Sequence, residues 1–299
     1  MQEQEINLSY FMTTFQKLDY LKIVLNDLIA SRHPDEEIII ADGGSKDGTA
    51  EWLLQLYNEK KIQGFISAKD KGEAHGANRA VLLCRGKVLK WINDDDIFCY
   101  KAIRECKDFL LQNDEFDVVA GDGFDNYNGD NLELISHIKH FKKWQKEKEP
   151  FGFYGPGFMM RRSSLPLLGM FNCLSRFVDN EYTFRATSLP IKMAWYTRPV
   201  FVRVINPESN TLKFLKAKKV EEGLNGIYRK IATGRPVSDL KKQEIVNRVK
   251  RKVYDMIYGR SSGIKNNNYQ ITDIEALYKS HRQTLSTAFE NAEGNAFIY

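Results

Sequence analysis

Hydrophobic residues in the first 120 positions follow two alternating patterns. Short, nearly continuous apolar runs are separated by segments in which apolar residues recur at helical spacing. Continuous apolar runs are typical of parallel strands that are covered on both faces. The predicted strands are residues 6–12, 37–41, 65–67 and 88–92, and the predicted helices between them are residues 18–28, 49–56 and 77–83. The alternation predicts a doubly wound, mainly parallel α/β sheet.

The pattern changes character along the rest of the chain. Further predicted elements are a helix at 102–111, a strand at 116–121, a loop or hairpin at 121–130 with a returning segment at 132–135, a short helix at 138–144, and closing strands at 191–195 and 200–204. Beyond position 206 the apolar spacing is helical, at 215–231, 245–257 and 274–289, with a linker at 259–268. We therefore expect a domain at 1–206 and a helical C-terminal region at 207–299.

Polar side chains follow the predicted strands at the points where the strands end. Thr13, Asp42, Asp70 and Asp95 each come just after an apolar run. Ligands of open α/β sheets bind beyond the carboxyl ends of the strands, so these side chains are expected to share one edge. The glycines that follow Asp42 allow a tight turn close to a ligand. The sequence thus predicts a binding site at this edge.

The most unusual stretch places three consecutive carboxylates, Asp94 to Asp96, directly after a predicted buried strand. Adjacent like charges repel one another and resist desolvation, so a divalent cation or a cluster of donors is expected among them. The alternative is an acidic turn that caps the next helix, because Asp is favoured at helix N-termini. These residues alone leave both interpretations open.

A second acidic site lies at Asp179, between the aromatic residues Phe177 and Tyr182. A partly desolvated carboxylate has a raised pKa and can act as a general base. The alternative is a helix N-terminus with an internal pair to Arg185. The nearby segment 151–158 is rich in aromatic residues and glycine, which suits either the flat face of a sugar or base, or core packing.

Composition bears on the size of the core and on the cellular compartment. The chain has 299 residues, of which 42% are hydrophobic, enough for a large core. The four cysteines lack metal-ligand spacing, which predicts free thiols in a reducing compartment and no zinc site. The N-terminus lacks the order of a signal peptide, and no apolar stretch approaches the roughly 18 residues of a membrane span. We expect a cytoplasmic protein.

The net charge of +5 is modest, but its distribution is uneven. Lysine and arginine crowd the C-terminal third, above all at 213–219 and 248–252. Such faces are usually solvated, and no nucleic-acid motif accompanies them, so no nucleic-acid partner is expected. The basic helices could instead dock on the inner face of a membrane.

Taken together, the ordered motifs resemble those of a family 2 glycosyltransferase with the GT-A fold. The resemblance covers roughly residues 6–204. It rests on Thr13-Thr14-Phe15, on the run from Ile39 to Thr49, on Asp70-Lys71-Gly72 with Asn78 downstream, on Trp91 to Asp96, on Gly157 to Arg162, and on Asp179-Asn180-Glu181 with Arg185. Asn93 departs from the usual DxD pattern, which leaves the register of the metal ligand open.

The resemblance implies a role for each matching residue. Asp95 and Asp96 would hold Mn²⁺ or Mg²⁺ against the diphosphate of a nucleotide sugar, and Asp179 would be the catalytic base. The residues expected to contact the donor are Thr13, Phe15, Asp42, Asp70, Asn78 and Asp94.

The implied activity is inverting transfer of a sugar, from a UDP-sugar by preference, to a hydroxyl of a glycan or lipid-linked acceptor in surface polysaccharide synthesis. Two alternatives stay open. One is a sugar-phosphate nucleotidyltransferase, although its usual Gly-rich basic loop after the first strand is missing. The other is a nucleotide-sugar-binding scaffold of an envelope-assembly complex that performs no catalysis.

Overall fold

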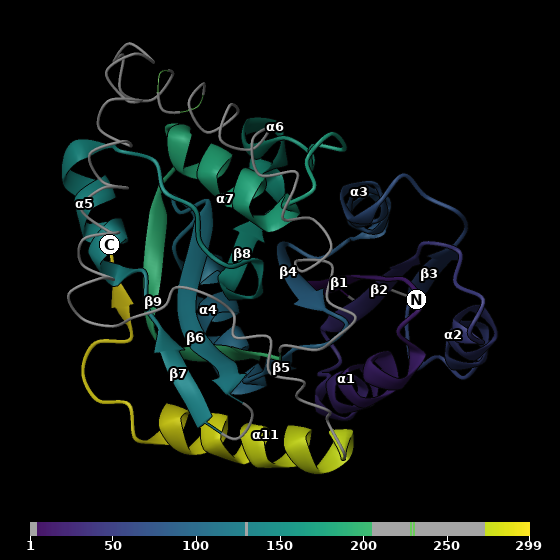
Figure 1. Cartoon of the computed structure of the whole chain (residues 1–299). Helices are drawn as coiled ribbons and strands as arrows, with labels where there is room; N and C mark the ends of the chain where they lie inside the picture. Colours follow the sequence, from purple (N-terminus) through teal and green to yellow (C-terminus); the bar gives the residue numbers. More distant parts are fainter. Residues whose placement is uncertain (1–4, 129–130, 205–227, 229, 231–272) are drawn as a thin grey trace, which may run out of the picture.

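The computed structural model describes residues 5–128, 131–204, 228, 230 and 273–299 (Figure 1). The first half alternates strand and helix as the apolar pattern predicts. Its elements are β1 (Leu8–Thr14), α1 (Leu18–Ser31), β2 (Glu36–Asp42), α2 (Thr49–Asn58), β3 (Gly64–Ser67), α3 (Glu73–Leu83), β4 (Val88–Asn93), β5 (Ile97–Phe98) and α4 (Tyr100–Gln112). β1, β2 and β4 are buried along almost their whole length, as expected of central parallel strands.

The second half completes the same sheet. Its elements are β6 (Val118–Asn128), β7 (Asn131–Ile135), α5 (Ile138–Glu147), the 3₁₀ turns η1 (Gly155–Gly157) and η2 (Arg162–Ser164), β8 (Phe158–Arg161), α6 (Leu165–Leu168), α7 (Val178–Ser188), β9 (Met193–Arg203), α11 (Ile274–Glu290) and β10 (Phe297–Ile298). The two predicted closing strands form one continuous strand, β9, and the segment 158–161, which was not predicted as a strand, forms β8.

The main path of the sheet runs β10-β9-β6-β8-β4-β1-β2-β3, with β5 paired to β9 and β7 paired to β6. β3, β2, β1 and β4 are mutually parallel, whereas β8 lies antiparallel between β4 and β6. β6 and β9 are again parallel to each other. This arrangement confirms the predicted fold class, a mainly parallel doubly wound sheet.

Helices cover both faces of the sheet (Figure 1), and a cluster of buried hydrophobic side chains lies on each face. One face packs against α1, α2, α4 and α11, and the other packs against α3, α5 and α7. Alternate residues of β1 point to opposite layers: Tyr10 and Met12 into the first, Phe11 into the second. The helices thereby leave the strand ends as the place where polar side chains can gather.

The C-terminal region contributes directly to this fold. α11 packs against β9 and β5, and β10 adds an antiparallel strand to the edge at β9. The predicted boundary at 206 and the predicted helices at 215–231 and 245–257 lie outside the described residues, apart from Tyr228 and Lys230. Membrane docking through their basic faces stays a prediction. Within the described part of the chain, no helix is long and apolar enough to cross a bilayer.

Candidate active site

Strand register brings the predicted polar residues to one edge of the sheet. Thr14 at the end of β1 lies opposite Asp42 at the end of β2, which in turn lies opposite Ser67 at the end of β3. On the other side, Thr13 pairs with Asn93, the last residue of β4 before the acidic turn. Because all four strands are parallel, their carboxyl ends form one rim.

Thr13, Phe15 and Asp70 pack closely against two glycines at this rim. A Cβ added to Gly43 would lie 3.2 Å from both Asp70 Oδ2 and the Phe15 ring, and one added to Gly76 would lie 3.1 Å from Asp70 Oδ2 and from Thr13 Cγ2. The absence of side chains at Gly43 and Gly76 therefore lets Thr13, Phe15 and Asp70 come together. Phe15 is 57% exposed, unusually high for a large aromatic side chain, so its face is available for stacking.

Two other predicted donor-binding residues have their side chains engaged within the protein. The Asp42 carboxylate accepts hydrogen bonds from the Ser45 amide and hydroxyl and from the Ser67 hydroxyl at 2.6 Å. Asn78 donates to the Phe171 carbonyl at 2.9 Å and accepts from the Phe171 amide at 2.7 Å. Asn78 thus joins α3 to the segment before α7, and its contact with a donor stays a prediction.

Two carboxylates of the acidic turn share one partner, and the third has different ones. The Lys17 ammonium lies 2.5 Å from Asp95 Oδ2 and 3.4 Å from Asp94 Oδ1. Asp96 instead accepts from Asn93 Nδ2 at 2.7 Å and from the Val204 amide at 2.9 Å, at the end of β9. Asp94 and Asp95 therefore form one acidic pair, while Asp96 ties the turn to the sheet.

Burial shapes the ionisation of this turn. It raises the pKa of Asp94 to about 6, with the Lys17 charge opposing the shift and the Asp95 charge adding to it. Burial and the neighbouring Asp95 likewise raise the pKa of Asp96 well above its usual value. The turn therefore resists carrying its full negative charge unless a cation faces it.

The C-terminal helix α11 contacts the backbone of the acidic turn. The Tyr278 hydroxyl, almost completely buried, donates a hydrogen bond to the backbone carbonyl of Asp95. α11 also reaches α1 through an ion pair between Arg282 and Asp27 at 3.1 Å. No motif in the sequence points to Tyr278, because the contact joins residues 183 positions apart.

Tyr278→Phe is expected to remove the hydroxyl that satisfies the Asp95 carbonyl. The free energy of unfolding should fall by about 1–2 kcal/mol, and Mn²⁺ affinity should weaken, because a buried carbonyl loses its donor and the turn loses its anchor. Urea unfolding and Mn²⁺ titration would measure both effects. Tyr299→Phe, at the exposed C-terminal residue, is the matched control. Wild-type values for Tyr278→Phe would show that α11 does not order the turn.

Asp179 begins the first turn of α7. Its carboxylate accepts from the Asn180 amide at 2.7 Å and more weakly from the Gly155 amide at 3.4 Å. A Cβ at Gly155 would lie 3.0 Å from Asp179 Cβ and 3.3 Å from the Trp91 ring, so glycine is required for this close approach. Burial raises the pKa of Asp179, although these amides and the charge of Arg203 oppose the shift.

A buried lysine holds the turn that contacts Asp179. Lys90 on β4 donates to the carbonyl of Pro156, within η1, and to that of Phe158, which directly follows η1. Complete burial lowers the pKa of Lys90 to about 7. The aromatic segment 151–158 is therefore largely core: Phe151, Phe153 and Phe158 are buried, and Tyr154 is its partly exposed aromatic residue.

Arg203, at the end of β9, is a cation of this rim that the sequence reading did not single out. It forms a two-pronged ion pair with the fully buried Asp125, with Nη2 2.7 Å from Oδ2, and stacks over the Tyr154 ring at 4.5 Å. Its charge acts on both Asp179 and Asp96. The Arg185 guanidinium, by contrast, pairs with Glu181 at 2.8 Å within α7.

Glu73, the first residue of α3, is influenced by the charges of both the acidic turn and Asp179. Burial raises the pKa of Glu73 to about 8, and the charges of Asp179, Asp94 and Asp95 contribute to the rise. Glu73 was not predicted from the sequence, where it looks like an ordinary acidic residue at a helix N-terminus.

Glu73→Gln is expected to change how stability depends on pH. The raised pKa means that the folded state keeps a proton that the unfolded state releases near pH 4.5, so wild-type stability declines as pH rises from there to about 8. The variant should match wild type at pH 4 and exceed it at pH 8.5 in thermal unfolding. Glu293→Gln, at an exposed position, should show no such crossover. Parallel pH curves for Glu73→Gln and wild type would contradict this ionisation.

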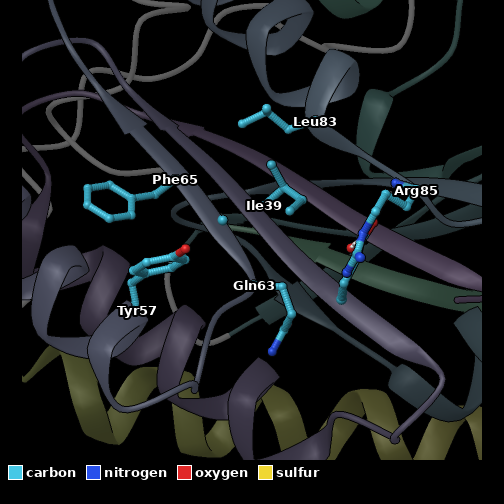
Figure 2. A pocket seen from close by; sticks show the side chains of 8 residues that line it. Ile39, Tyr57, Gln63, Phe65, Leu83 and Arg85 are labelled. Carbon is cyan, nitrogen blue, oxygen red and sulfur yellow. Dashed lines mark hydrogen bonds and ion pairs between the residues drawn. The ribbon is translucent and has the colours of Figure 1, made fainter. Parts of the chain in front are cut away.

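Two other features lie away from the rim. His33, Asp35 and Glu36 bring possible metal-ligand atoms within 4.8 Å of one another, but Glu36 starts β2 and already pairs with Arg104 at 2.8 Å. A hollow of about 410 Å³ lies at the β3 edge (Figure 2). Its walls include Tyr57, Phe65 and Leu83, and at its base Arg85 Nε lies 3.1 Å from the Glu37 carboxylate.

Comparison with known proteins agrees with this architecture. The family model described as glycosyl transferase family 2 matches residues 9–167, more than half of the chain. The chain therefore belongs to glycosyl transferase family 2, and the structure is that of a GT-A glycosyltransferase. The class of enzyme predicted from the motifs, a transferase of glycosyl groups, is confirmed.

Individual relatives match over shorter stretches. Chondroitin synthase of Escherichia coli is 30% identical over 100 residues, which are 33% of this chain and 15% of the relative. The putative teichuronic acid biosynthesis glycosyltransferase TuaG of Bacillus subtilis is 24% identical over 106 residues, 35% of this chain and 42% of the relative. The chain thus spans less than half the length of these two relatives.

Solved structures share the fold at low sequence identity. TarS 1–349 of S. aureus in complex with UDP-GlcNAc aligns with a TM-score of 0.59 at 12% identity, covering 95% of this chain and 82% of that one. Mannosyltransferase PcManGT from Pyrobaculum calidifontis, in complex with GDP-Man and Mn²⁺, aligns with a TM-score of 0.54 at 12% identity, covering 94% and 87%.

Proposed function

We propose that this protein transfers a sugar from a nucleotide-diphosphate sugar, with a UDP-sugar favoured, to a hydroxyl of a glycan or lipid-linked acceptor in surface polysaccharide synthesis. The observation that carries the proposal is that the partly buried Asp179 lies beside β4, the strand that leads into the acidic pair Asp94 and Asp95: a Cβ at Gly155 would lie 3.0 Å from Asp179 Cβ and 3.3 Å from the Trp91 ring of β4. The structural neighbours support the donor class, since the TarS and PcManGT structures hold UDP-GlcNAc and GDP-Man.

The donor would lie along the rim formed by the strand ends. The base would stack on the exposed Phe15 ring, beside Thr13 and Asp70, which Gly43 and Gly76 allow to pack close together. Asp42, bonded to Ser45 and Ser67, would shape this pocket and present its remaining acceptor capacity to the nucleoside. Asn78 would act through the segment that it fixes at Phe171.

The acidic turn fits a hard divalent cation. Its ligands are carboxylate oxygens, the type that Mn²⁺ and Mg²⁺ take together with water and phosphate oxygens, and Lys17 alone neutralises only one of the two charges of Asp94 and Asp95. Asp95, with Asp94 beside it, would hold the ion, and Asp96 would hold the turn. When bound, such an ion neutralises negative charge on the leaving diphosphate.

Asp179 would serve as the general base. Its raised pKa makes it a stronger proton acceptor than an exposed aspartate, and the Gly155 amide keeps its carboxylate directed at the rim. It would remove the proton from the acceptor hydroxyl as that oxygen attacks the anomeric carbon from the face opposite the diphosphate. One displacement of this kind inverts the configuration and requires no covalent enzyme intermediate.

A thermal-shift panel tests the donor part of the proposal. UDP, GDP, TDP and CMP would each be added with and without Mn²⁺. A ligand that binds only the folded state raises the melting temperature, and at about 100 times its Kd it adds about 2.7 kcal/mol to stability. UDP with Mn²⁺ is expected to give the largest increase. Absence of a shift with every nucleotide would contradict donor binding. Release of pyrophosphate from a nucleoside triphosphate and a sugar phosphate would favour a nucleotidyltransferase. Donor binding without sugar transfer would favour a non-catalytic scaffold.

A further inference from the structure

The position of Lys17 is fixed by its backbone neighbours. The Gln16 amide donates to Ser45 Oγ at 2.8 Å, and the Leu18 amide donates to Asp47 Oδ2 at 3.0 Å. Gln16 also has a positive φ of 55°, which non-glycine residues adopt infrequently. The β2–α2 loop thus holds the chain on both sides of Lys17 and directs its side chain toward the acidic turn.

The ammonium group of Lys17 lies where a cation between Asp94 and Asp95 would lie. It is 2.5 Å from Asp95 Oδ2 and 3.4 Å from Asp94 Oδ1, and its side chain is only 11% exposed. A Mg²⁺ ion takes oxygen ligands at about 2.0–2.1 Å. A metal ion held between the two carboxylates would therefore take the position of the ammonium and displace it.

We propose that Lys17 is a resident cation of the diphosphate site: it neutralises Asp94 and Asp95 before metal binds, and it pairs with the diphosphate of the bound donor. The inference rests on the proposed nucleotide-sugar function. Two buried carboxylates need a counter-charge to remain together, and the incoming diphosphate offers oxygens to which a displaced ammonium can turn.

Two binding measurements follow from this competition. In Lys17→Met, Mn²⁺ alone should bind at least tenfold more tightly than in wild type, because the competing ammonium is gone. UDP measured in EDTA should bind at least tenfold more weakly, because the protein-borne positive charge is gone. Calorimetry or ultrafiltration gives both constants. Lys22→Met, at an exposed position on α1, the helix that follows Lys17, is the control and should change neither.

A charge-balanced variant guards against misfolding. Lys17→Met leaves two buried carboxylates without their partner, whereas the double variant Lys17→Met with Asp94→Asn removes one charge of each sign. The double variant is expected to unfold near the wild-type temperature. Its affinity for UDP in EDTA should nevertheless be at least tenfold lower than that of wild type. Lys17→Arg, which keeps the charge, should retain UDP binding within about threefold.

The outcomes separate this inference from the proposed function. If wild type binds neither Mn²⁺ nor UDP, the proposed function fails. If wild type binds both and neither Lys17 variant that removes the ammonium changes UDP binding in EDTA, the inference alone is wrong. Weaker Mn²⁺ binding in Lys17→Met would also overturn it, since it would make Lys17 a support of the metal site and not its competitor.

Discussion

Asp179→Asn is expected to abolish sugar transfer while leaving donor binding intact. The amide cannot accept the proton of the acceptor hydroxyl, so kcat should fall by about 10²–10⁴-fold, the usual contribution of a positioned general base. That range corresponds to about 3–5 kcal/mol of transition-state stabilisation. Asparagine can keep the contact with the Gly155 amide, so the turn at η1 should be preserved.

The measurement is transfer from a radiolabelled or mass-tagged UDP-sugar, alongside the Kd for UDP with Mn²⁺. The pH profile is a second readout: the wild-type rate should fall at acid pH through a pKa above 3.8, because burial raises the pKa of Asp179 and protonation removes the base. The variant should lack this acid limb. Near-wild-type turnover by Asp179→Asn would assign the base to another carboxyl group of the rim, with Glu73 first in line.

The sheet was predictable where a single rule decides the outcome. Buried parallel strands show continuous apolar runs, and their ends carry the polar residues, so the rim bearing Thr13, Asp42 and the acidic turn follows from the pattern. β8 was missed because it has only four residues and pairs antiparallel between strands that are distant in sequence. A short apolar run of this length is equally typical of a loop that packs on the core, so the sequence does not distinguish the two.

β9 joins two segments that were predicted as separate strands from their apolar runs. Pro199 lies between these segments and lacks an amide proton for the sheet. In the structure the strand continues through it, because the pairing with β6 shifts register there: Tyr196 lies opposite Gly121, and Phe201 lies opposite Gly123. The irregularity accommodates the missing donor, a feature that depends on the partner strand and not on the local sequence.

The short-range motifs predicted part of the candidate site. The prediction lacked the contacts between residues that are distant in the sequence. The motifs bring Asp70, Phe15 and Thr13 together as expected, although the chemical role of each stays a prediction. Lys17, Glu73, Arg203 and Tyr278 were missed. Each acts on the rim through side-chain contacts or charges that join distant parts of the chain, so only the folded arrangement shows them. Asn78 is the opposite case. Its motif predicts contact with the donor, whereas in the structure its side chain forms hydrogen bonds with the Phe171 backbone.

Asp95→Asn is expected to remove metal-dependent donor binding together with transfer. The substitution halves the negative charge of the pair with Asp94, and an amide oxygen is a poorer ligand for a hard cation than a carboxylate. Mn²⁺-dependent UDP affinity should fall by at least tenfold, and turnover by about 10³-fold. Because Lys17 then faces Asp94 alone, UDP binding in EDTA should be retained or strengthened, a result that a misfolded protein would not give.

Asp96→Asn is the matched control one residue away. Asp96 accepts hydrogen bonds from Asn93 and from the Val204 amide, so its replacement should lower the free energy of unfolding by about 1–3 kcal/mol and leave the Mn²⁺ affinity of the folded protein within about threefold of wild type. Urea unfolding and Mn²⁺ titration of both variants separate the two roles. Loss of metal binding in Asp96→Asn with a wild-type response in Asp95→Asn would reverse the assignment and make Asp96 the ligand.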